Sequence, residues 1–450
     1  MKKDPGVDTE KDFNIIDASP SKTLFIDMLT KDIPLIRAIL DLVDNSVDGA
    51  RRLRPNENYK GLRIDLDVSK NRFKISDNCG GMSIQTAREY AFRFGRADDA
   101  PETPGSVGQF GVGMKRAFFK MGKKFIVESK TKNSSFVVNV DVNQWEEEDK
   151  WVFHFKNFSE NIKNSQDDIG TTITVSALHD NVSENFGQDN FRTRLAQELA
   201  TAHLLSINKG LQMTLNGIPL QMRDLTLYMS KHIKPVLKKI EYKVKDYSDP
   251  VKVEIIAGVA DSSPKDAGWY VFCNGRLLLE RDKTPVTGWG EKDGGKIPLY
   301  HQQYARFRGY VFFNSDYAEL LPWNTTKTGV DTDSPIYQSV RLEMVSLMRP
   351  IIDFLNELKE SKGENEDKES QLEEIVSSTK SFKIEEIDSF TKTFETPKYK
   401  KTEKVADTVP IAYRAPKKQA EIVKRSLGAK SWREVGEKTF EYYLKLEGDE

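Results

Sequence analysis

Cysteine is scarce in this chain, and its scarcity limits what can hold the fold together. The 450 residues include only Cys79 and Cys273, which excludes the multi-disulfide framework of a small secreted domain. The opening segment MKKDPGVDTEKDF also lacks the apolar stretch of a secretory signal peptide. We therefore expect a protein of the reducing cytoplasm.

Long apolar runs and a strong excess of one charge are also missing. No run of about 18 apolar residues occurs, so the sequence predicts no membrane-spanning helix and no membrane partner. A formal net charge of −1 argues against a chain-wide field for nucleic acid. The five histidines show no metal-ligand spacing. What remains, with 38% hydrophobic and 30% charged residues, is the composition of a globular protein.

The length and the charge pattern predict several domains. At roughly 150 residues per domain, a chain of this length suggests about two to three. Residues 360–388 hold ten acidic residues against four lysines, whereas 396–438 hold twelve basic residues against five acidic ones. We therefore predict domains over 1–205 and 206–350, an acidic linker or helix over 351–395, and a small basic helical segment over 396–450.

The hydrophobic periodicity of the first domain predicts helices packed on a sheet. Residues 20–58 have helical spacing with a break at Pro34, and 62–77 alternate as a hairpin. A second helical stretch spans 83–94, a loop rich in glycine and proline follows, and another helix begins near Met114. Four strands come next. We expect an α/β sandwich with helices on one face of a mostly antiparallel sheet, and a second domain that is also α/β.

The segment DLVDNSVDGA at 41–50 carries the first chemical signal. Asp41, Asn45 and Asp48 are spaced i, i+4 and i+7, so they share one helical face. Asn45 offers a carbonyl oxygen to Mg²⁺, and Asp41 places a carboxylate one turn earlier, where it can take a proton from water. Without further motifs, this face would be only the solvated side of an amphipathic helix.

The segment VGQFGVGMKRAF at 107–118 is the second signal. Its glycines, Gly108, Gly111 and Gly113, run into Lys115, Arg116 and a helix, where free backbone N–H groups favour an anion such as a phosphate.

A candidate base site lies elsewhere in the sequence. Asp77 ends a strand and can accept a hydrogen bond from an exocyclic amine such as that of adenine, and Gly80 and Gly81 let the backbone approach a flat base. Thr171 begins a later strand, where its hydroxyl can support Asp77. Together with the two segments above, these residues predict an ATP site.

These motifs, in this order, resemble the GHKL superfamily of ATPases, which includes gyrase B subunits, heat-shock chaperones, histidine kinases and MutL. The segment GQFGVGMKRAFFKMGKKFIVESK is most similar to microrchidia (MORC) proteins. The resemblance implies a Bergerat fold over 1–205, a transducer-like domain over 206–350, and closure of a lid with dimerisation when ATP binds.

The resemblance also implies roles for individual residues. Asn45 would hold Mg²⁺, Asp77 would bind the adenine amine, and Thr171 would support that site. Lys327, within LPWNTTKTGVD, would reach the γ-phosphate. The base would lie beside Gly81 and Met82, and the phosphates beside Gly108, Gln109, Phe110, Gly111, Val112, Gly113, Met114 and Lys115.

The chain departs from the superfamily at two positions. Asp41 stands where the family has a glutamate that polarises water, one methylene longer, and Cys79 with Gly80 alters the segment next to the base. Misplacement by about 1 Å can cost on the order of a hundredfold in rate. Two functions therefore stay open: a Mg²⁺-dependent ATPase with slow turnover, and a nucleotide-gated module that binds without hydrolysis. The basic segment over 396–450 is either a nucleic-acid contact or a solvated tail that binds a protein partner.

Overall fold

A computed structural model describes residues 20–95, 105–108, 111–221, 223–291, 296–324, 327–363, 371–397 and 411–448. The chain forms two compact units, Met1–Lys398 and Tyr399–Glu450. The first unit holds both large sheets and every described residue of the predicted nucleotide site.

Two helices open the described chain. Helix α1 (Lys22–Lys31) begins where the Ser21 hydroxyl accepts a hydrogen bond from the Leu24 N–H, which satisfies an otherwise unpaired donor. Helix α2 (Leu35–Leu53) follows Pro34, whose fixed φ suits the position before a helix and prevents α1 from continuing. The predicted break at Pro34 is confirmed.

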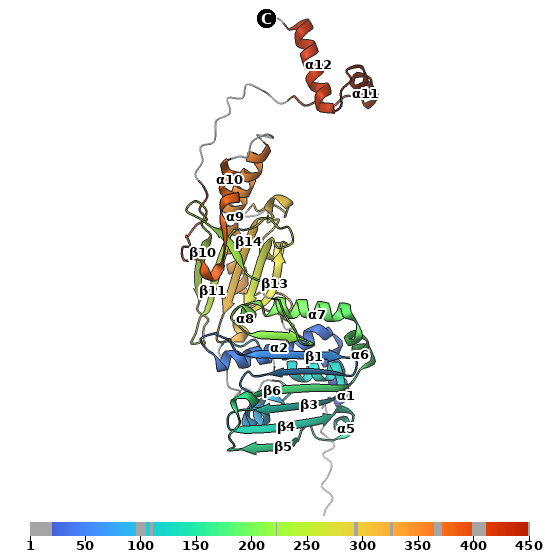
Figure 1. Ribbon diagram of the computed structural model, residues 1–450, viewed down its shortest axis with the longest axis vertical. Helices are drawn as coiled ribbons and strands as arrows, with labels where there is room; N and C mark the ends of the chain where they lie inside the picture. Colours follow the sequence, from blue (N-terminus) through green and yellow to red (C-terminus); the bar gives the residue numbers. More distant parts are fainter. Residues whose placement is uncertain are drawn as a thin grey trace, which may run out of the picture. The chain divides into compact units, whose positions relative to one another are not determined.

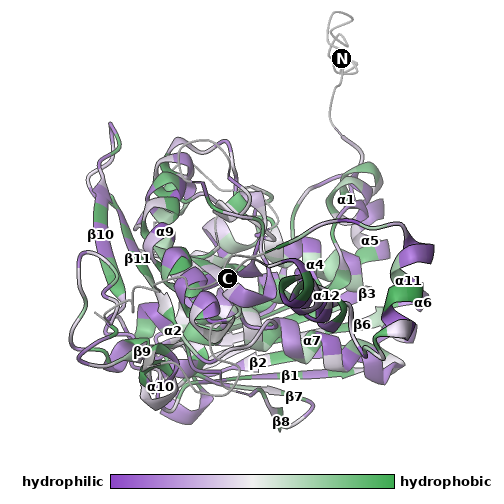
Figure 2. Ribbon diagram, turned by 90° about the horizontal axis from the view of Figure 1, so that it is seen from above, coloured by the Kyte–Doolittle hydropathy of each residue, from purple (hydrophilic) through white to green (hydrophobic). Residues whose placement is uncertain are grey.

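An eight-stranded sheet forms the body of the first domain, in the order β5-β4-β3-β6-β2-β1-β7-β8. Buried and less buried residues alternate along β1, because successive side chains of a strand point to opposite faces. Figure 2 colours the strands by hydropathy, with hydrophilic and hydrophobic residues in purple and green. All neighbouring strands are antiparallel except β1 and β7. The strands are β1 (Arg63–Ser69), β2 (Arg72–Asp77), β3 (Gly122–Lys130), β4 (Ser134–Asp141), β5 (Phe155–Glu160), β6 (Gly170–Leu178), β7 (Gln212–Leu215) and β8 (Ile218–Pro219).

Helices pack on this sheet and close the core between them (Figure 1). Helix α2 contacts α4 and β2, and α4 contacts β3 and β6. The predicted α/β sandwich is confirmed. The other helices of this domain are α3 (Ile84–Thr86), the π-helix η1 (Ala87–Ala91), α4 (Gly113–Met121), α5 (Val142–Glu147), α6 (Asp180–Gly187), α7 (Asp189–Ala202) and α8 (Leu204–Asn208).

Strands β7 and β8 correct the predicted start of the second domain. Their sequence, QMTLNGIP, was expected to open the domain over 206–350, but β7 pairs with β1 and β8 pairs with β7. Alternation identifies a strand and does not reveal its neighbour, which here lies about 150 residues earlier in the chain.

The second sheet has five strands in the order β10-β11-β14-β12-β13. Strands β12 and β13 form a hairpin whose turn residues, Asn274 and Gly275, have positive φ angles of 45° and 73°, as a two-residue hairpin turn requires. Helix α9 (Pro335–Gly363) packs on β11 and β14. Its strands are β10 (Val236–Tyr242), β11 (Val251–Val259), β12 (Gly268–Cys273), β13 (Arg276–Asp282) and β14 (Phe307–Asn314), while β9 (Thr226–Met229) belongs to a separate two-stranded sheet.

Two elements connect the sheets. Helix α7 contacts both α2 and β13, and α8 also contacts β13, so the two domains pack through this pair of helices (Figure 1).

The segment expected to be an acidic linker or helix over 351–395 is folded against the second sheet. Helix α10 (Gln371–Ser378) contacts α9, and β15 (Lys380–Lys383) pairs with β9. Leu372, Val376, Ile384, Ile387 and Phe394 are buried. The helical alternative fits α9 up to residue 363 and α10, whereas a solvated linker does not fit residues 371–397, because these buried apolar residues lie between the acidic ones.

The second unit contains two described helices, α11 (Lys417–Ser426) and α12 (Trp432–Glu447). Helix α12 begins at the Ser431 hydroxyl, which accepts the Glu434 N–H. Across the described ranges, no helix is both long enough and apolar enough to cross a membrane.

Candidate functional site

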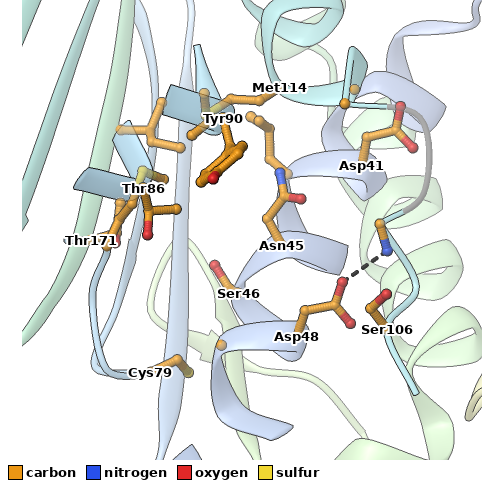
Figure 3. Close-up of a pocket in the computed structure, with 18 of the residues that line it drawn as sticks. Asp41, Asn45, Ser46, Asp48, Cys79, Thr86, Tyr90, Ser106, Met114 and Thr171 are labelled. Atoms are coloured by element: carbon orange, nitrogen blue, oxygen red, sulfur yellow. Dashed lines mark hydrogen bonds between the residues drawn. The ribbon is translucent and has the colours of Figure 1, made fainter. Parts of the chain in front are cut away.

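One face of α2 packs into the core and the other borders a cavity. Leu40, Val43 and Val47 are buried among the apolar residues of the core. Asp41, Asn45 and Asp48 lie on the cavity side, as the helical spacing predicted (Figure 3).

The cavity has a volume of about 610 Å³ and lies between α2, α4 and the ends of β2 and β6. The sequence-predicted residues that line it are Asp41, Asn45, Asp77, Gly81, Met82, Gly108, Gly111, Val112, Gly113, Met114, Lys115, Thr171 and Lys327. Gln109 and Phe110 lie outside the described residues. Residues from segments nearly 300 positions apart in the sequence thus surround one cavity.

Asp77 anchors one end of the cavity. Its Oδ2 accepts a hydrogen bond from the Ser46 hydroxyl at 2.6 Å, and its Oδ1 accepts from the backbone N–H of Cys79 at 2.9 Å. Burial raises the pKa of Asp77, although the Ser46 hydroxyl and the Cys79 N–H oppose the rise. This carboxylate is a fixed acceptor in a partly apolar pocket.

Thr171 contacts Asp77 differently from the prediction. Its backbone N–H, rather than its hydroxyl, faces Asp77 Oδ1 at 3.4 Å. The Thr171 hydroxyl lies 3.0 Å from the Ser129 hydroxyl. The hydroxyl that supports Asp77 is that of Ser46, because the Thr171 hydroxyl pairs with Ser129 instead.

Gly81 lets the backbone pass close to β3. Its φ is +70°, and an added Cβ would lie 2.1 Å from the carbonyl oxygen of Lys130, which only glycine avoids. The next residue, Met82, donates its N–H to the Ser129 hydroxyl at 2.7 Å. This segment forms a fixed wall beside Asp77.

Asp48 holds the first part of the glycine loop. Its two oxygens accept the backbone N–H groups of Val107 and Gly108, each at 2.8 Å, and Figure 3 draws one of these bonds as a dashed line. From the second domain, the Asn274 side-chain amide donates to the Ser106 carbonyl at 3.0 Å. The base of the loop is therefore attached to both domains.

Lys115 lies in the first turn of α4, at the other end of the cavity. Its ammonium donates to the Ala91 carbonyl at 2.8 Å and to the Gly111 carbonyl. Burial lowers the pKa of Lys115 to about 7, because the ammonium group loses hydration there. An anion in the cavity would favour its charged form.

Asp41 faces two cations. Its Oδ2 accepts a hydrogen bond from Arg116 Nη2 at 2.5 Å, and its Oδ1 lies 3.9 Å from Lys327 Nζ. Neither cation comes from α2: Arg116 belongs to α4 and Lys327 follows the second sheet. Arg116 therefore occupies one of the two oxygens of Asp41.

Asp44, the neighbour of Asn45, is almost fully buried at 1% side-chain exposure. Lys327 Nζ lies 2.9 Å from its Oδ2, and Arg276 Nη1 lies 3.1 Å from its Oδ1. Burial would raise the pKa of Asp44, but the charges of Arg276 and Lys327 outweigh it and lower the pKa to about 2. Asp44 is thus ionised.

The charges around Asp41 and Asp44 do not balance. Three cations, Arg116, Arg276 and Lys327, face these two carboxylates. Burial and the charge of Arg276 lower the pKa of the adjacent His203 to about 3, so this imidazole adds no charge at neutral pH. The site has an excess positive charge beside the cavity, which favours an anionic ligand.

The donors suit Mg²⁺ only if a ligand supplies most of them. Within the described ranges, no three His, Cys, Asp or Glu side chains are arranged to hold a metal ion. Asn45 Oδ1 borders the cavity, and a Cβ added to Gly108 would lie 3.4 Å from it. The space that glycine leaves beside Asn45 fits a cation that keeps water and phosphate oxygens as its main ligands.

Three residues of the site were not predicted from the sequence: Asp44, Ser46 and Arg276. The signal for Ser46 and Asp44 was their position beside Asn45 on α2. Arg276 had no local signal, because its partner Asp44 lies in another domain.

Comparison with known proteins identifies the matching region. The family model described as histidine kinase-, DNA gyrase B-, and HSP90-like ATPase matches residues 33–171. This region includes α2, Asp77 and the glycine loop. No curated protein matches the chain.

Proposed function

The chain belongs to the histidine kinase-, DNA gyrase B- and HSP90-like ATPases through residues 33–171, and on that premise we propose that it binds ATP with Mg²⁺ and hydrolyses it to ADP and phosphate. The observation that carries the proposal is the single cavity with Asp77 at one end and Arg116, Lys115 and Lys327 around the other. A carboxylate acceptor suits the adenine amine, and the cations suit the phosphates.

In this proposal, each end of the nucleotide has its own contacts. The adenine amine donates to Asp77, beside Gly81 and Met82. The phosphates accept hydrogen bonds from backbone N–H groups at the start of α4, where the helix dipole also favours negative charge. Lys327 reaches the γ-phosphate from the second domain, a role supported by its place in the lining of the cavity.

Asn45 would hold the Mg²⁺, which would neutralise charge on the phosphate oxygens during the reaction. Asp41 is the proposed general base. It would take a proton from a water molecule whose oxygen bonds to the γ-phosphorus while the bond to the bridging β–γ oxygen breaks. ADP leaves with the electron pair of that bond.

The test is a phosphate-release assay on the purified chain and two variants. We expect Asp41→Asn to lower kcat by about a hundredfold or more, as loss of a positioned base does, with little change in ATP affinity. Asn45→Ala should lose both Mg²⁺-dependent affinity and turnover. Unchanged turnover in both variants would show that this cavity does not catalyse hydrolysis.

A nucleotide-gated binding module without turnover is the second candidate. Its specific support is the Asp41–Arg116 ion pair, which occupies the proposed base, together with the short aspartate side chain. Tight ATP binding with no phosphate release above that of Asp41→Asn would select this function.

We also propose that ATP binding drives dimerisation through the first domain, as the family resemblance implies. Sedimentation of the 51.4 kDa chain with a non-hydrolysable ATP analogue should show a dimer that ADP does not produce. A monomer under both conditions would reject this part of the proposal. We further propose a MORC-like or chaperone-like role on a client macromolecule. We also propose the cytoplasmic location that the sequence predicts.

The basic second unit supports a nucleic-acid partner as an alternative to a protein partner. Lys417, Lys418, Lys424 and Arg425 lie on α11 with a single acidic residue among them, Glu421. Deletion of 399–450 should abolish salt-dependent DNA binding if this unit carries it. The deletion must begin after Lys398, because Thr391 pairs with Val236 of β10 and Glu395 pairs with Lys234 just before that strand.

A further inference from the structure

Asp44 is a buried carboxylate whose two oxygens have different partners. Oδ2 accepts a hydrogen bond from Lys327, while Oδ1 has no hydrogen-bond donor and is stabilised by the charge of Arg276 at 3.1 Å. We call Asp44, His203, Arg276 and Lys327 the Asp44 cluster. All four side chains are at least nine-tenths buried.

The two cations of the cluster have different access to the nucleotide cavity. Lys327 lines the cavity and also lies 3.9 Å from Asp41. Arg276 is 2% exposed, and its Nη1 is 2.9 Å from His203 Nε2, away from the cavity lining. Only Lys327 can move toward a ligand without crossing the core.

The departure of Lys327 has an electrostatic cost that depends on Arg276. Removing the sole partner of a buried charge is strongly unfavourable, because the remaining ion has neither water nor a counter-charge. With Arg276 in place, Asp44 keeps one counter-ion. His203, a neutral acceptor at physiological pH, helps to fix the guanidinium there.

We propose that Asp44 is the resting partner of Lys327, and that Arg276 is the permanent counter-ion that lets Lys327 leave Asp44 for a terminal phosphate. This inference rests on the proposed ATP function and adds a positioning role for Arg276. The chain would then distinguish ATP from ADP by a transfer of one lysine between two anions. Arg276 sets how easily that transfer occurs.

The proposal predicts opposite effects of two substitutions in the same cluster. In Arg276→Gln, Lys327 is the only lysine or arginine of the described residues left within ion-pair distance of Asp44 and stays with it, so the preference for ATP over ADP falls. In Asp44→Asn, Lys327 has no resting partner and is free for the phosphate, so the preference rises. If Arg276 and Asp44 only maintained the fold, the two substitutions would not shift the preference for ATP over ADP in opposite directions.

The experiment is calorimetric titration of the full chain with AMP-PNP and with ADP, each with Mg²⁺. We expect Arg276→Gln to lower the ratio of the two affinities by about tenfold, the effect of a coupling in the usual range, with ADP affinity changed by less than about twofold. Lys327→Ala should lower the affinity ratio to a similar value. The double variant Asp44→Asn with Arg276→Gln should have the wild-type ratio again.

Arg308→Gln is the matched control. Arg308 is a buried arginine of the same sheet that donates to the backbone carbonyls of Ala305 and Phe307, so its variant should keep the wild-type ratio. Arg276→Lys, which keeps the charge, should also keep it.

The outcomes separate this inference from the function on which it rests. A wild-type ratio in Arg276→Gln, or a fall in Asp44→Asn to the level of Lys327→Ala, would overturn the role of Arg276 while leaving ATP binding intact. Absence of any nucleotide binding to the wild-type chain would overturn the proposed function, and this inference with it. If Arg276→Gln does not fold, the direction of the change in Asp44→Asn decides alone.

Discussion

At the scale of single residues, the site is defined by ionisable groups that burial has shifted from their ordinary behaviour. Burial lowers the pKa of Lys115 to about 7, while Asp44 is held ionised by two cations. Such groups respond to a charged ligand more strongly than exposed ones, because little water screens them. Each therefore makes a measurable prediction.

The lowered pKa of Lys115 predicts that nucleotide affinity depends on pH. The pKa of Lys115 is about 7, so at higher pH this lysine is mostly neutral in the nucleotide-free protein. A bound polyphosphate favours the ammonium form, so binding should take up a proton. Affinity for AMP-PNP should therefore fall as pH rises from about 7.5 to 9. Calorimetry in buffers of different ionisation enthalpy measures the proton uptake directly.

Two lysine variants provide the comparison. Lys115→Met should bind more weakly below pH 8 and lose the proton uptake. Lys120→Met, on the same helix, removes a lysine that donates to the Thr30 carbonyl and does not line the cavity, and it should behave like the wild type. Equal proton uptake in all three proteins would contradict the assignment to Lys115.

At the scale of elements, α2 organises the whole site. It supplies Asp41 and Asn45 to the cavity, Asp44 to the buried ion pairs behind it, and Asp48 to the base of the glycine loop. Because these four residues lie within eight positions of one rigid helix, their spacing does not depend on loops. The loop itself is fixed at its base by Asp48.

Asp48→Ala should therefore loosen the glycine loop. The change leaves the N–H groups of Val107 and Gly108 without their acceptor. An unsatisfied N–H on the buried Val107 costs about 1–3 kcal/mol, whereas that of the exposed Gly108 can bond to water. Hydrogen exchange of the peptide that contains residues 105–108 should become faster, and ADP should dissociate faster. Asp48→Asn, which keeps one acceptor oxygen, should have a smaller effect; unchanged exchange in Asp48→Ala would count against the clamp.

The segment over 371–397 makes a prediction about stability. A chain that ends at residue 363 loses β15 and the buried side chains of Ile384, Ile387 and Phe394. Loss of several such residues costs well over 2 kcal/mol, so Tm should fall by several degrees. A chain that ends at residue 398 should keep the wild-type Tm, and equal Tm values for the two truncations would show that the segment does not stabilise the second sheet.

Several elements could be predicted from the sequence because their signals are local. Helical spacing placed Asp41 and Asn45 on one face of α2, and Pro34 marked where α1 and α2 separate. The hairpin of β1 and β2 followed from alternation on both sides of a short turn.

Long-range pairings were not predictable in this way. The pairing of β7 with β1, the pairing of β15 with β9, and the ion pair of Arg276 with Asp44 join segments distant in sequence. A local pattern specifies which face of an element is buried, but not the element that covers it.

At the scale of the whole molecule, the structure joins a family-matched first domain to a second domain that contributes Lys327, Arg276 and Asn274 to the same region. A ligand that changes the position of the glycine loop or of Lys327 must therefore affect both domains. This arrangement supports a role for ATP in controlling the conformation of Met1–Lys398.

The most direct test of the account is calorimetric titration of the full chain with AMP-PNP and Mg²⁺, repeated with Asp77→Asn. The exposed Asp67 on the same sheet supplies the control variant Asp67→Asn. The account predicts one binding site per chain, affinity reduced by about tenfold or more in Asp77→Asn, where a hydrogen bond to a charged acceptor is lost, and wild-type affinity in Asp67→Asn. No binding to the wild-type chain, or equal binding by Asp77→Asn, would contradict it.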